Sequence, residues 1–253
     1  MGSWQLAVGS KDKLLFTAGC SLPTAHCPLL MIIAIDGPSG AGKSTLGRLL
    51  ARELKLLYID TGAMYRAAAL AVIESGVSTT DTAAVAEVVT RADINLEGDP
   101  DSLQVMLDGR DVSRLIRTEE VSHSSSVIST IPEVRRSLVN RQRELGRRAG
   151  GVVLDGRDIG TIVFPQADIK FFLTAAPEQR AQRRYEEDRL KERSASFEET
   201  LTEINTRDRR DSTRDDSPLA IAEDAIVIDS TECSIDEVLE QMIKAVRERN
   251  QKP

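Results

Sequence analysis

Short apolar runs alternate along the chain with longer segments in which apolar residues recur every three or four positions. The runs that read as buried strands are residues 32–35, 56–60, 152–154, 169–175 and 225–229. A helical pattern follows each of the first two runs, after a short loop in the case of the first, which is typical of a parallel sheet covered by helices. The pattern therefore predicts an α/β fold built around a five-stranded parallel sheet.

Two stretches depart from this alternation. Short alternating runs flank the turn-rich segment Gly98–Asp101, which predicts an antiparallel hairpin inside an insertion of about residues 90–127. The helical pattern of about residues 180–197 is rich in charge and lacks a long apolar face after Tyr185. We expect this charged hairpin to be an exposed arm or a mobile helical lid.

The opening segment precedes a second methionine, Met31, which stands directly before the first predicted strand. Its apolar stretch, residues 14–18, is too short for the core of a signal peptide. We therefore predict that residues 1–30 are an extension outside the fold, either a tag or an upstream start. Residues 31–253 then form one domain, whose core consists of residues 31–90 and 128–253.

The composition limits which functions the chain can have. Its 253 residues, of which 41% are hydrophobic, are enough to bury a sizeable core. A net charge of −7 argues against a chain devoted to nucleic acid, and the 3 cysteines and 2 histidines favour neither a disulfide framework nor a zinc site. No apolar run reaches the roughly 18 to 20 residues that span a bilayer, so we expect no membrane segment and a cytoplasmic location.

A glycine-rich segment follows the first strand with the pattern G-x-x-x-x-G-K-S and precedes an amphipathic helix, which is the usual setting of a phosphate-binding loop. Its glycines let backbone N–H groups approach a polyphosphate, and the helix directs its positive N-terminus at the anion. The lysine would lie along the β- and γ-phosphates. The residues expected to bind the nucleoside triphosphate are Gly37, Pro38, Ser39, Gly40, Ala41, Gly42, Lys43, Ser44 and Thr45.

Two oxygen-bearing side chains are expected to hold Mg²⁺. The hydroxyl of Ser44 is placed to ligate the ion in loops of this kind. The buried run 152–154 ends in Asp155, which has the form of a Walker B element whose carboxylate holds Mg²⁺ directly or through water. The sequence therefore predicts a magnesium site made by Ser44 and Asp155.

Basic residues gather near the predicted strand ends, in the charged hairpin and in a late arginine-rich segment. Thr61 and Arg66 follow the second strand, so they should face the same crevice as the loop lysine. Arg207, Asp211 and Arg214 are spaced by four and three positions and share one helix face. Such a cluster can neutralise the repulsion between two facing phosphate groups. These features indicate a phosphotransferase that acts on a small anionic acceptor, without naming that acceptor.

Five segments together resemble the motif set of bacterial cytidylate kinases, in order and at matching separations. They are GPSGAGKST, DTGAMYR, IRTEEV, VVLDGRDIGTIVF and RDRRDSTR, and the resemblance extends essentially from Met31 to the C-terminus. It implies a P-loop NTPase three-layer fold and transfer of the γ-phosphate of Mg-ATP to CMP or dCMP. The insertion would be the family's enlarged monophosphate-binding region, and the resemblance favours a monomer that acts on small molecules.

The resemblance also implies roles for single residues. Those expected to bind the acceptor are Thr61, Arg135 and Asp158 for the base, Ser126, Arg207 and Asp211 for the sugar, and Arg66, Arg157 and Arg214 for the phosphate. Cytosine chemistry is compatible with the first group, because its exocyclic amine needs acceptors whereas O2 and N3 need a donor. Those expected to be catalytic are Lys43, Arg157 and Arg214. Thr61 stands where many members of the family have serine, a change that keeps the hydroxyl.

Two alternatives stay open from the sequence. The chain could be another small-molecule kinase with the same core, acting on a different nucleoside monophosphate or on shikimate. It could also be a nucleotide-dependent switch or binding module, although the N-K-x-D guanine signature is lacking. The sequence does not decide between CMP and dCMP, nor which lid arginine contacts the transferring phosphoryl group. The candidates are Arg183, Arg184, Arg189 and Arg193.

Overall fold

The computed structural model describes residues 31–190 and 196–250. The predicted extension, residues 1–30, lies outside the described residues, and so does part of the predicted lid, residues 191–195. Five parallel strands form a central sheet within the described ranges. In their order across the sheet they are β2 (Leu57–Asp60), β6 (Gly151–Asp155), β1 (Met31–Asp36), β7 (Ile169–Thr174) and β8 (Ile226–Asp229).

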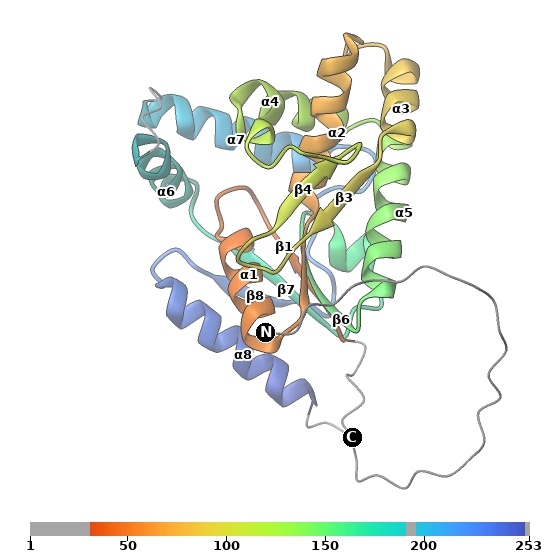
Figure 1. Cartoon of the computed structure of the whole chain (residues 1–253). Helices are drawn as coiled ribbons and strands as arrows, with labels where there is room; N and C mark the ends of the chain where they lie inside the picture. The colour runs from red at the N-terminus through yellow and green to blue at the C-terminus, as the bar shows by residue number, and fades with distance from the viewer. Residues whose placement is uncertain (1–30, 191–195, 251–253) are drawn as a thin grey trace, which may run out of the picture.

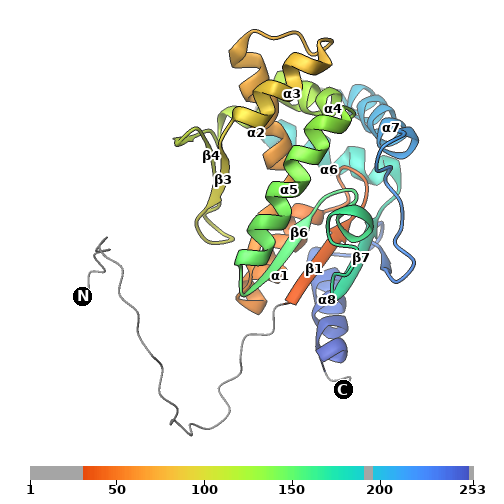
Figure 2. The same ribbon diagram turned by 90° about the vertical axis from the view of Figure 1, so that its right-hand side faces the viewer.

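The sheet lies between two layers of helices, as Figures 1 and 2 show. The main helices are α1 (Lys43–Leu54) and α8 (Ile235–Asn250) on one face and α2 (Thr61–Ser75) and α5 (Pro132–Arg148) on the other. Successive side chains of a strand point to opposite faces. Ile33 and Ile35 therefore pack in the cluster of α1 and α8, while Ala34 packs in the cluster of α2. The predicted three-layer α/β fold with a five-stranded parallel sheet is confirmed.

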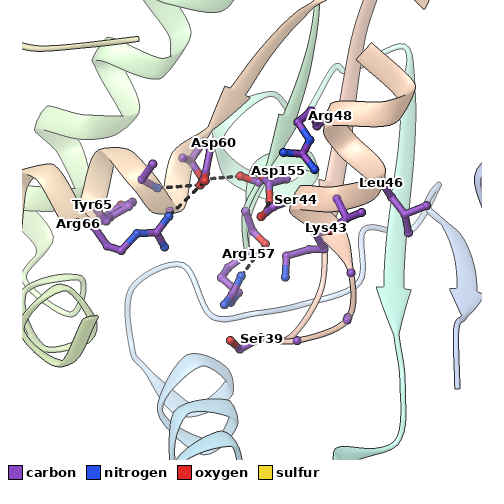
Figure 3. A pocket seen from close by; sticks show the side chains of 18 of the residues that line it. Ser39, Lys43, Ser44, Leu46, Arg48, Asp60, Tyr65, Arg66, Asp155 and Arg157 are labelled. Atoms are coloured by element: carbon purple, nitrogen blue, oxygen red, sulfur yellow. Dashed lines mark hydrogen bonds and ion pairs between the residues drawn. The ribbon is translucent and has the colours of Figure 1, made fainter. Parts of the chain in front are cut away.

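The carboxyl ends of β1, β2 and β6 meet at one edge of the sheet, because the three strands are parallel. Ile35 of β1 and Asp60 of β2 are both paired with Asp155 of β6. Asp60 also starts α2, since its carboxylate accepts a hydrogen bond from the amide of Ala63 at 2.7 Å. Figure 3 shows Asp60 and Asp155 close to Lys43, so this edge of the sheet collects several predicted site residues.

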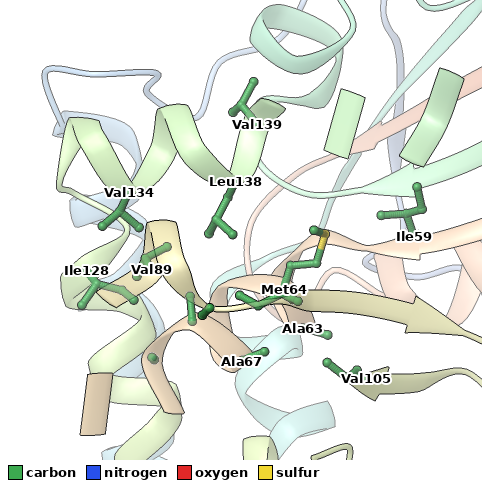
Figure 4. Packing of buried hydrophobic residues seen from close by; sticks show 14 of the residues in the cluster. Ile59, Ala63, Met64, Ala67, Val89, Val105, Ile128, Val134, Leu138 and Val139 are labelled. Atoms are coloured by element: carbon green, nitrogen blue, oxygen red, sulfur yellow. The ribbon is translucent and has the colours of Figure 1, made fainter. Parts of the chain in front are cut away.

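One buried cluster joins α2 to the sheet, to α5 and to the antiparallel insertion. Met64 and Ala67 of α2 lie close to Leu138 of α5 in this cluster (Figure 4), and all three are fully buried. Because α2 is enclosed by its neighbours, most of its surface is apolar, and its alanines allow them to approach closely. This packing holds the first turns of α2, which carry Thr61 and Arg66, in a defined position.

The insertion contains a three-stranded antiparallel sheet. The helix α3 (Thr82–Arg91) precedes it, and its elements are β3 (Ile94–Glu97), β4 (Gln104–Leu107), β5 (Arg110–Asp111), a 3-10 helix (Leu115–Arg117) and α4 (Glu119–Ile128). Val105 and Leu107 alternate along β4 and pack into the cluster around α2. The predicted antiparallel hairpin is confirmed, whereas the domain boundaries, including residues 90–127, stay predictions.

The two late helices α6 (Pro177–Leu190) and α7 (Phe197–Thr213) pack against each other. Most side chains of α6 are exposed or half-buried, as expected of a charged arm, but Arg180 and Asp188 are buried, with exposed fractions of 3% and 8%. Partners satisfy both side chains, which removes most of the cost of burying their charges. No described helix has the length and apolar character needed to cross a membrane.

Candidate active site

A cleft of about 880 Å³ opens at the carboxyl edge of the sheet. Its walls come from the glycine-rich loop after β1, the start of α2, helices α4 and α5, the turn after β6, and α7. All the residues predicted for the site line this cleft except Gly37 and Pro38, the first two residues of the loop. The structure therefore brings together side chains from segments that are distant in the sequence.

The glycine-rich loop has a backbone path that its glycines make possible. At Gly37, with φ of 145°, a Cβ atom would lie 2.0 Å from the carbonyl oxygen of Leu173 on β7. At Gly40, with φ of 78°, a Cβ atom would lie 3.0 Å from the Cβ of Arg180 on α6. Side chains at these two positions would push the loop off its support. The loop instead ends in α1, whose N-terminus lies at the cleft and favours an anion there.

Lys43 is buried at the start of α1, where its ammonium group donates a hydrogen bond to the carbonyl of Pro38 at 2.6 Å. Burial lowers the pKa of Lys43 well below its ordinary value of 10.5, and the positive charges of Arg157 and Arg207 lower it further. An anion bound among Lys43, Arg157 and Arg207 would offset the repulsion between these three cations. The surroundings of Lys43 are therefore suited to a phosphate group.

The two predicted metal ligands are in direct contact. The hydroxyl of Ser44 donates a hydrogen bond to Asp155 at 2.7 Å, and the hydroxyl of Tyr58 donates to the same carboxylate at 3.1 Å. Burial raises the pKa of Asp155 from 3.8 to about 6, and the neighbouring carboxylate of Asp60 adds to this effect. A bound cation would counter both effects.

Hard oxygen donors of this kind fit Mg²⁺. The described residues contain no group of three or more acidic, histidine or cysteine side chains that could enclose a metal ion. The protein would therefore supply a small part of the coordination shell, as is usual for Mg²⁺ ions that are bound together with substrate phosphates.

The three residues expected to read the base lie together. Arg135 and Asp158 form a buried ion pair, and Nη2 of Arg214 lies 3.9 Å from the other carboxylate oxygen of Asp158. The guanidinium of Arg135 also lies over the ring of Tyr65, 5.8 Å from its centre. Thr61 donates to the backbone carbonyl of residue 155 at 2.6 Å, so its hydroxyl oxygen can still accept a hydrogen bond.

Several buried guanidinium nitrogens in the cleft have no hydrogen-bond partner among the described residues. They are Nε of Arg66, Nε of Arg135, Nε of Arg207 and Nη2 of Arg214. Burial lowers the pKa of Arg207 to about 10, and the adjacent positive charge of Arg157 acts in the same direction. Buried donors without acceptors cost free energy until an acceptor reaches them. This part of the cleft is therefore poised to bind an anion with several oxygens.

Carboxylates hold two arginines of the cleft, Arg157 and Arg66, in place. Arg157 donates through Nε to Asp211 on α7 at 2.8 Å, and Arg66 donates through Nη2 to Asp60 at 3.2 Å. Burial acts to raise the pKa of Asp211, but Arg157 and Arg207 lower it on balance, so the carboxylate is favoured. The arginines are thus oriented before any ligand arrives.

One positioning contact escaped the sequence analysis. Arg210 of α7 donates through Nη1 to the hydroxyl of Ser126 on α4 at 2.6 Å. Arginine has no acceptor, so Ser126 must accept in this bond and keeps its own hydrogen for a second partner. The signal was present in the sequence, because Arg210 follows Arg207 by three positions and extends the same arginine-rich helix face.

Asp36 was also missed. It ends β1, is 4% exposed, and accepts hydrogen bonds from the amides of Ile159 at 2.8 Å and Gly160 at 2.7 Å. These amides begin the short π-helix Ile159–Val163, which follows Asp158. Burial raises the pKa of Asp36 from 3.8 to about 6. An acidic residue directly after a buried apolar strand was the available signal.

The candidate lid arginines occupy different positions. Arg183 and Arg184 line the cleft, where Arg183 donates to the hydroxyl of Ser230 at 3.1 Å and Arg184 donates to Asp188 at 3.0 Å. The guanidinium of Arg189 lies 5.8 Å from the centre of the Tyr185 ring. Arg193 lies outside the described residues. Of the described candidates, Arg183 and Arg184 are therefore the ones placed at the cleft.

Comparison with known proteins identifies close relatives. The model of the cytidylate kinase family matches residues 33–248. The cytidylate kinase of Geobacter sp. is 49% identical over 219 residues, which are 87% of this chain and 94% of that protein. The cytidylate kinase of Caldanaerobacter subterraneus subsp. tengcongensis is 50% identical over 219 residues, or 87% and 96% of the two chains. That of Bacillus subtilis is 46% identical over 218 residues, or 86% and 97%.

Solved structures give a weaker likeness. The shikimate kinase of Acinetobacter baumannii in complex with shikimate aligns with a TM-score of 0.45 and 16% identity, over 88% of this chain and 96% of that chain. A gluconokinase of Sinorhizobium meliloti aligns with a TM-score of 0.45 and 12% identity, over 87% and 93%. Likenesses at this level do not bear on the function of the chain.

Proposed function

The chain belongs to the cytidylate kinase family, and we propose that its cleft holds Mg-ATP at the glycine-rich end and CMP or dCMP at the arginine-rich end. The enzyme transfers the γ-phosphate of ATP to CMP or dCMP, giving ADP and CDP or dCDP. Other acceptors, such as a different nucleoside monophosphate or shikimate, are not favoured, because relatives at 46% to 50% identity are cytidylate kinases.

The observation that carries this arrangement is the set of buried arginine nitrogens without hydrogen-bond partners among the described residues, which includes nitrogens of Arg66, Arg207 and Arg214. They line the same cleft as the glycine-rich loop and are matched to an acceptor that brings its own phosphate. A single triphosphate at the loop would not need this second group of cations. The cleft is therefore interpreted as two facing phosphate sites.

At the donor end, the loop from Gly37 to Thr45 binds the phosphates of ATP through its backbone amides and the N-terminus of α1. Lys43 places its charge on the β- and γ-phosphates, which reverses the repulsion it experiences from Arg157. Ser44 and Asp155 would hold Mg²⁺, which when bound neutralises charge on the phosphate oxygens.

At the acceptor end, the base is read by groups of opposite hydrogen-bonding character. Asp158 and Thr61 accept from the exocyclic amine of cytosine, and Arg135 donates to O2 and N3. The buried pair of Arg135 and Asp158 sets donor and acceptor side by side before the base arrives. A uracil, which presents a carbonyl in place of the amine, would face Asp158 with an acceptor against an acceptor.

The sugar and the phosphate are held on the side of α7. Ser126, Arg207 and Asp211 bind the sugar. Arg66, Arg157 and Arg214 bind the acceptor phosphate, so that one of its oxygens faces the γ-phosphate of ATP. These two residue groups line the same cleft.

The transfer itself needs charge stabilisation and alignment. An oxygen of the acceptor phosphate forms a bond to the γ-phosphorus, while the bond to the β–γ bridging oxygen breaks and ADP leaves. The acceptor is a phosphate dianion, so no general base has to remove a proton from it. Lys43, Arg157 and Arg214 stabilise the negative charge that is shared between the two nucleotides during transfer.

The chain supports action as a monomer, because its own described residues supply both ends of the cleft. The acidic net charge of −7 supports small-molecule substrates over nucleic acid. We place the reaction in the cytoplasm, where the nucleotide substrates are made.

The experiment that tests this function is a panel of acceptors with Mg-ATP. The panel contains CMP, dCMP, UMP, AMP and shikimate, and the measured quantity is kcat/KM for each. We expect CMP or dCMP to exceed the others by about tenfold or more, since each lost or mismatched hydrogen bond in a buried site costs about 1 kcal/mol or more. A preference for AMP, UMP or shikimate would overturn the assignment.

A further inference from the structure

Arg180, in the first turn of α6, is satisfied by three acceptors from three segments. Its Nε donates to the carbonyl of Ala175 at 2.9 Å, its Nη1 to the carbonyl of Ser39 at 3.0 Å, and its Nη2 to the carboxylate of Asp208 at 2.6 Å. Its side chain is 4% exposed, which is rare for arginine unless all its donors are paired. The guanidinium therefore forms a rigid junction.

The junction joins the two ends of the cleft. Ser39 belongs to the loop that binds the donor phosphates, and Asp208 lies on α7 between two acceptor ligands, Arg207 and Asp211. A Cβ atom at Gly40 would lie 3.0 Å from the Cβ of Arg180, so the loop backbone rests directly on the stem of this arginine. A shift of the loop therefore has to move Arg180, because packed interiors transmit displacement.

Asp208 connects a displacement of the loop to the acceptor site. Its second carboxylate oxygen, Oδ1, is buried and has no hydrogen-bond partner within the described parts of the chain. Its negative charge also helps to raise the pKa of Arg157, after the larger contributions of Asp211 and Asp155, against the lowering effect of burial. The position of Asp208 therefore influences the charge environment of an arginine that grips the acceptor phosphate.

We propose that the ion pair of Arg180 and Asp208 couples the two ends of the cleft, so that ATP bound at the loop tightens CMP binding at α7. Both are positioning residues, because they act through Ser39, Arg207 and Asp211 and not on the substrates. The inference rests on the proposed placement of CMP against α7. By thermodynamic linkage, CMP must tighten ATP binding by the same factor.

The test measures CMP affinity by calorimetry with and without a saturating non-hydrolysable Mg-ATP analogue. In the unmodified enzyme, the analogue should lower the CMP dissociation constant by about fivefold or more, which is the lower range of measured couplings. In the double variant Arg180→Met/Asp208→Asn, this ratio should fall below about twofold. CMP affinity without the analogue should change less than the ratio, which a general loss of structure would not produce.

The double variant is preferred because a single substitution would leave one buried charge without its partner, and that destabilises the fold strongly. Arg209→Met is the matched control. Arg209 is exposed on α7 beside Asp208. Its replacement by methionine removes the same positive charge, through the same substitution, as Arg180→Met does. This control should keep the coupling of the unmodified enzyme.

A double variant that melts like the unmodified enzyme and keeps its coupling would overturn the proposal, and so would an unmodified enzyme without coupling. If the double variant does not fold, Asp208→Glu alone decides, because it keeps a negative charge beside Arg180 and displaces the carboxylate by one methylene group. A reduction of the coupling by about threefold is then expected, and an unchanged coupling refutes the proposal. Failure of the proposed function is distinct, since the unmodified enzyme would then not bind or phosphorylate CMP.

Discussion

The two ends of the cleft are built in different ways. The proposed donor end consists of one continuous segment, residues 37–45, together with Asp155 of β6, and backbone amides and a helix N-terminus supply much of its chemistry. The acceptor end is assembled from α2, α4, α5, the turn after β6 and α7, and its groups are charged side chains held in pairs such as Arg157 with Asp211.

This difference predicts different responses to substitution. Backbone groups cannot be removed by changing a side chain, so the donor end depends on the conformation of its loop and on Lys43. At the acceptor end each side chain orients the next one, so a single change should affect the substrate and the partner residue together.

The largest effect is expected from Lys43→Ala, which removes the side-chain charge from the donor end. We expect kcat to fall by about 10²-fold or more, because the lost cation stabilises charge in the transition state. Steady-state kinetics with Mg-ATP and CMP measure this loss. Lys244→Ala is the control, since Lys244 is an exposed lysine of α8 and its loss should leave kcat unchanged. Near-normal turnover of Lys43→Ala would contradict the assigned role.

Arg135→Met tests the acceptor end. It leaves Asp158 buried with only Arg214 nearby, at 3.9 Å, as an ion-pair partner among the described residues, so the base-reading pair is broken. We expect kcat/KM for CMP to fall by about 30-fold or more, while the KM for ATP changes by less than about threefold. Arg136→Met is the matched control, because Arg136 is exposed on the same helix. Equal losses for CMP and ATP would show that Arg135 does not read the base.

Asp36 lies beneath both ends, since it precedes the donor loop and holds the amides that follow Asp158. Its folded pKa of about 6 is above the unfolded value of 3.8. Its contribution to stability is therefore complete below about pH 4 and is lost as the pH rises through about 6. In the variant Asp36→Asn the side chain at this position cannot ionise, so this part of the stability is not lost as the pH rises.

Denaturant unfolding at several pH values measures the difference between Asp36→Asn and the unmodified protein. The free energy of unfolding of the variant minus that of the unmodified protein should increase by about 2 kcal/mol between about pH 4 and pH 7. Glu240→Gln is a suitable control, because Glu240 is an exposed acid of α8. Parallel pH profiles for Asp36→Asn and the unmodified protein would rule out this titration.

The smallest effect is expected from Arg210→Met, which removes the donor that orients Ser126. The KM for CMP should rise by about fivefold, as is usual for the loss of one hydrogen bond, with little change in kcat. In a Ser126→Ala background the same substitution should have almost no further effect, because the two residues then share no contact. Additive losses would mean that Arg210 acts on CMP binding by another route.

Local sequence determined the fold class, the donor loop and the ends of the strands. The loop can be recognised in the sequence because its glycines, lysine and serine lie within one short segment and act through local backbone geometry. Asp60 and Asp155 could be placed because the carboxyl ends of parallel strands meet at one edge, whatever the rest of the chain does. The candidate site residues were found with the help of a family resemblance, and the structure gathers nearly all of them in one cleft.

Only the tertiary structure decided which charged side chains are partners. The charge pattern of α6 predicted an exposed helix, yet Arg180 is buried because Ser39, Ala175 and Asp208 reach it from three separate segments. The pairs of Arg135 with Asp158 and of Arg210 with Ser126 likewise join different elements. Helical spacing tells which face a residue occupies, but a long flexible side chain selects its partner only after the elements have packed. The sequence therefore indicated the phosphate-binding loop, and the packed fold decided which side chains join this loop to the proposed acceptor site.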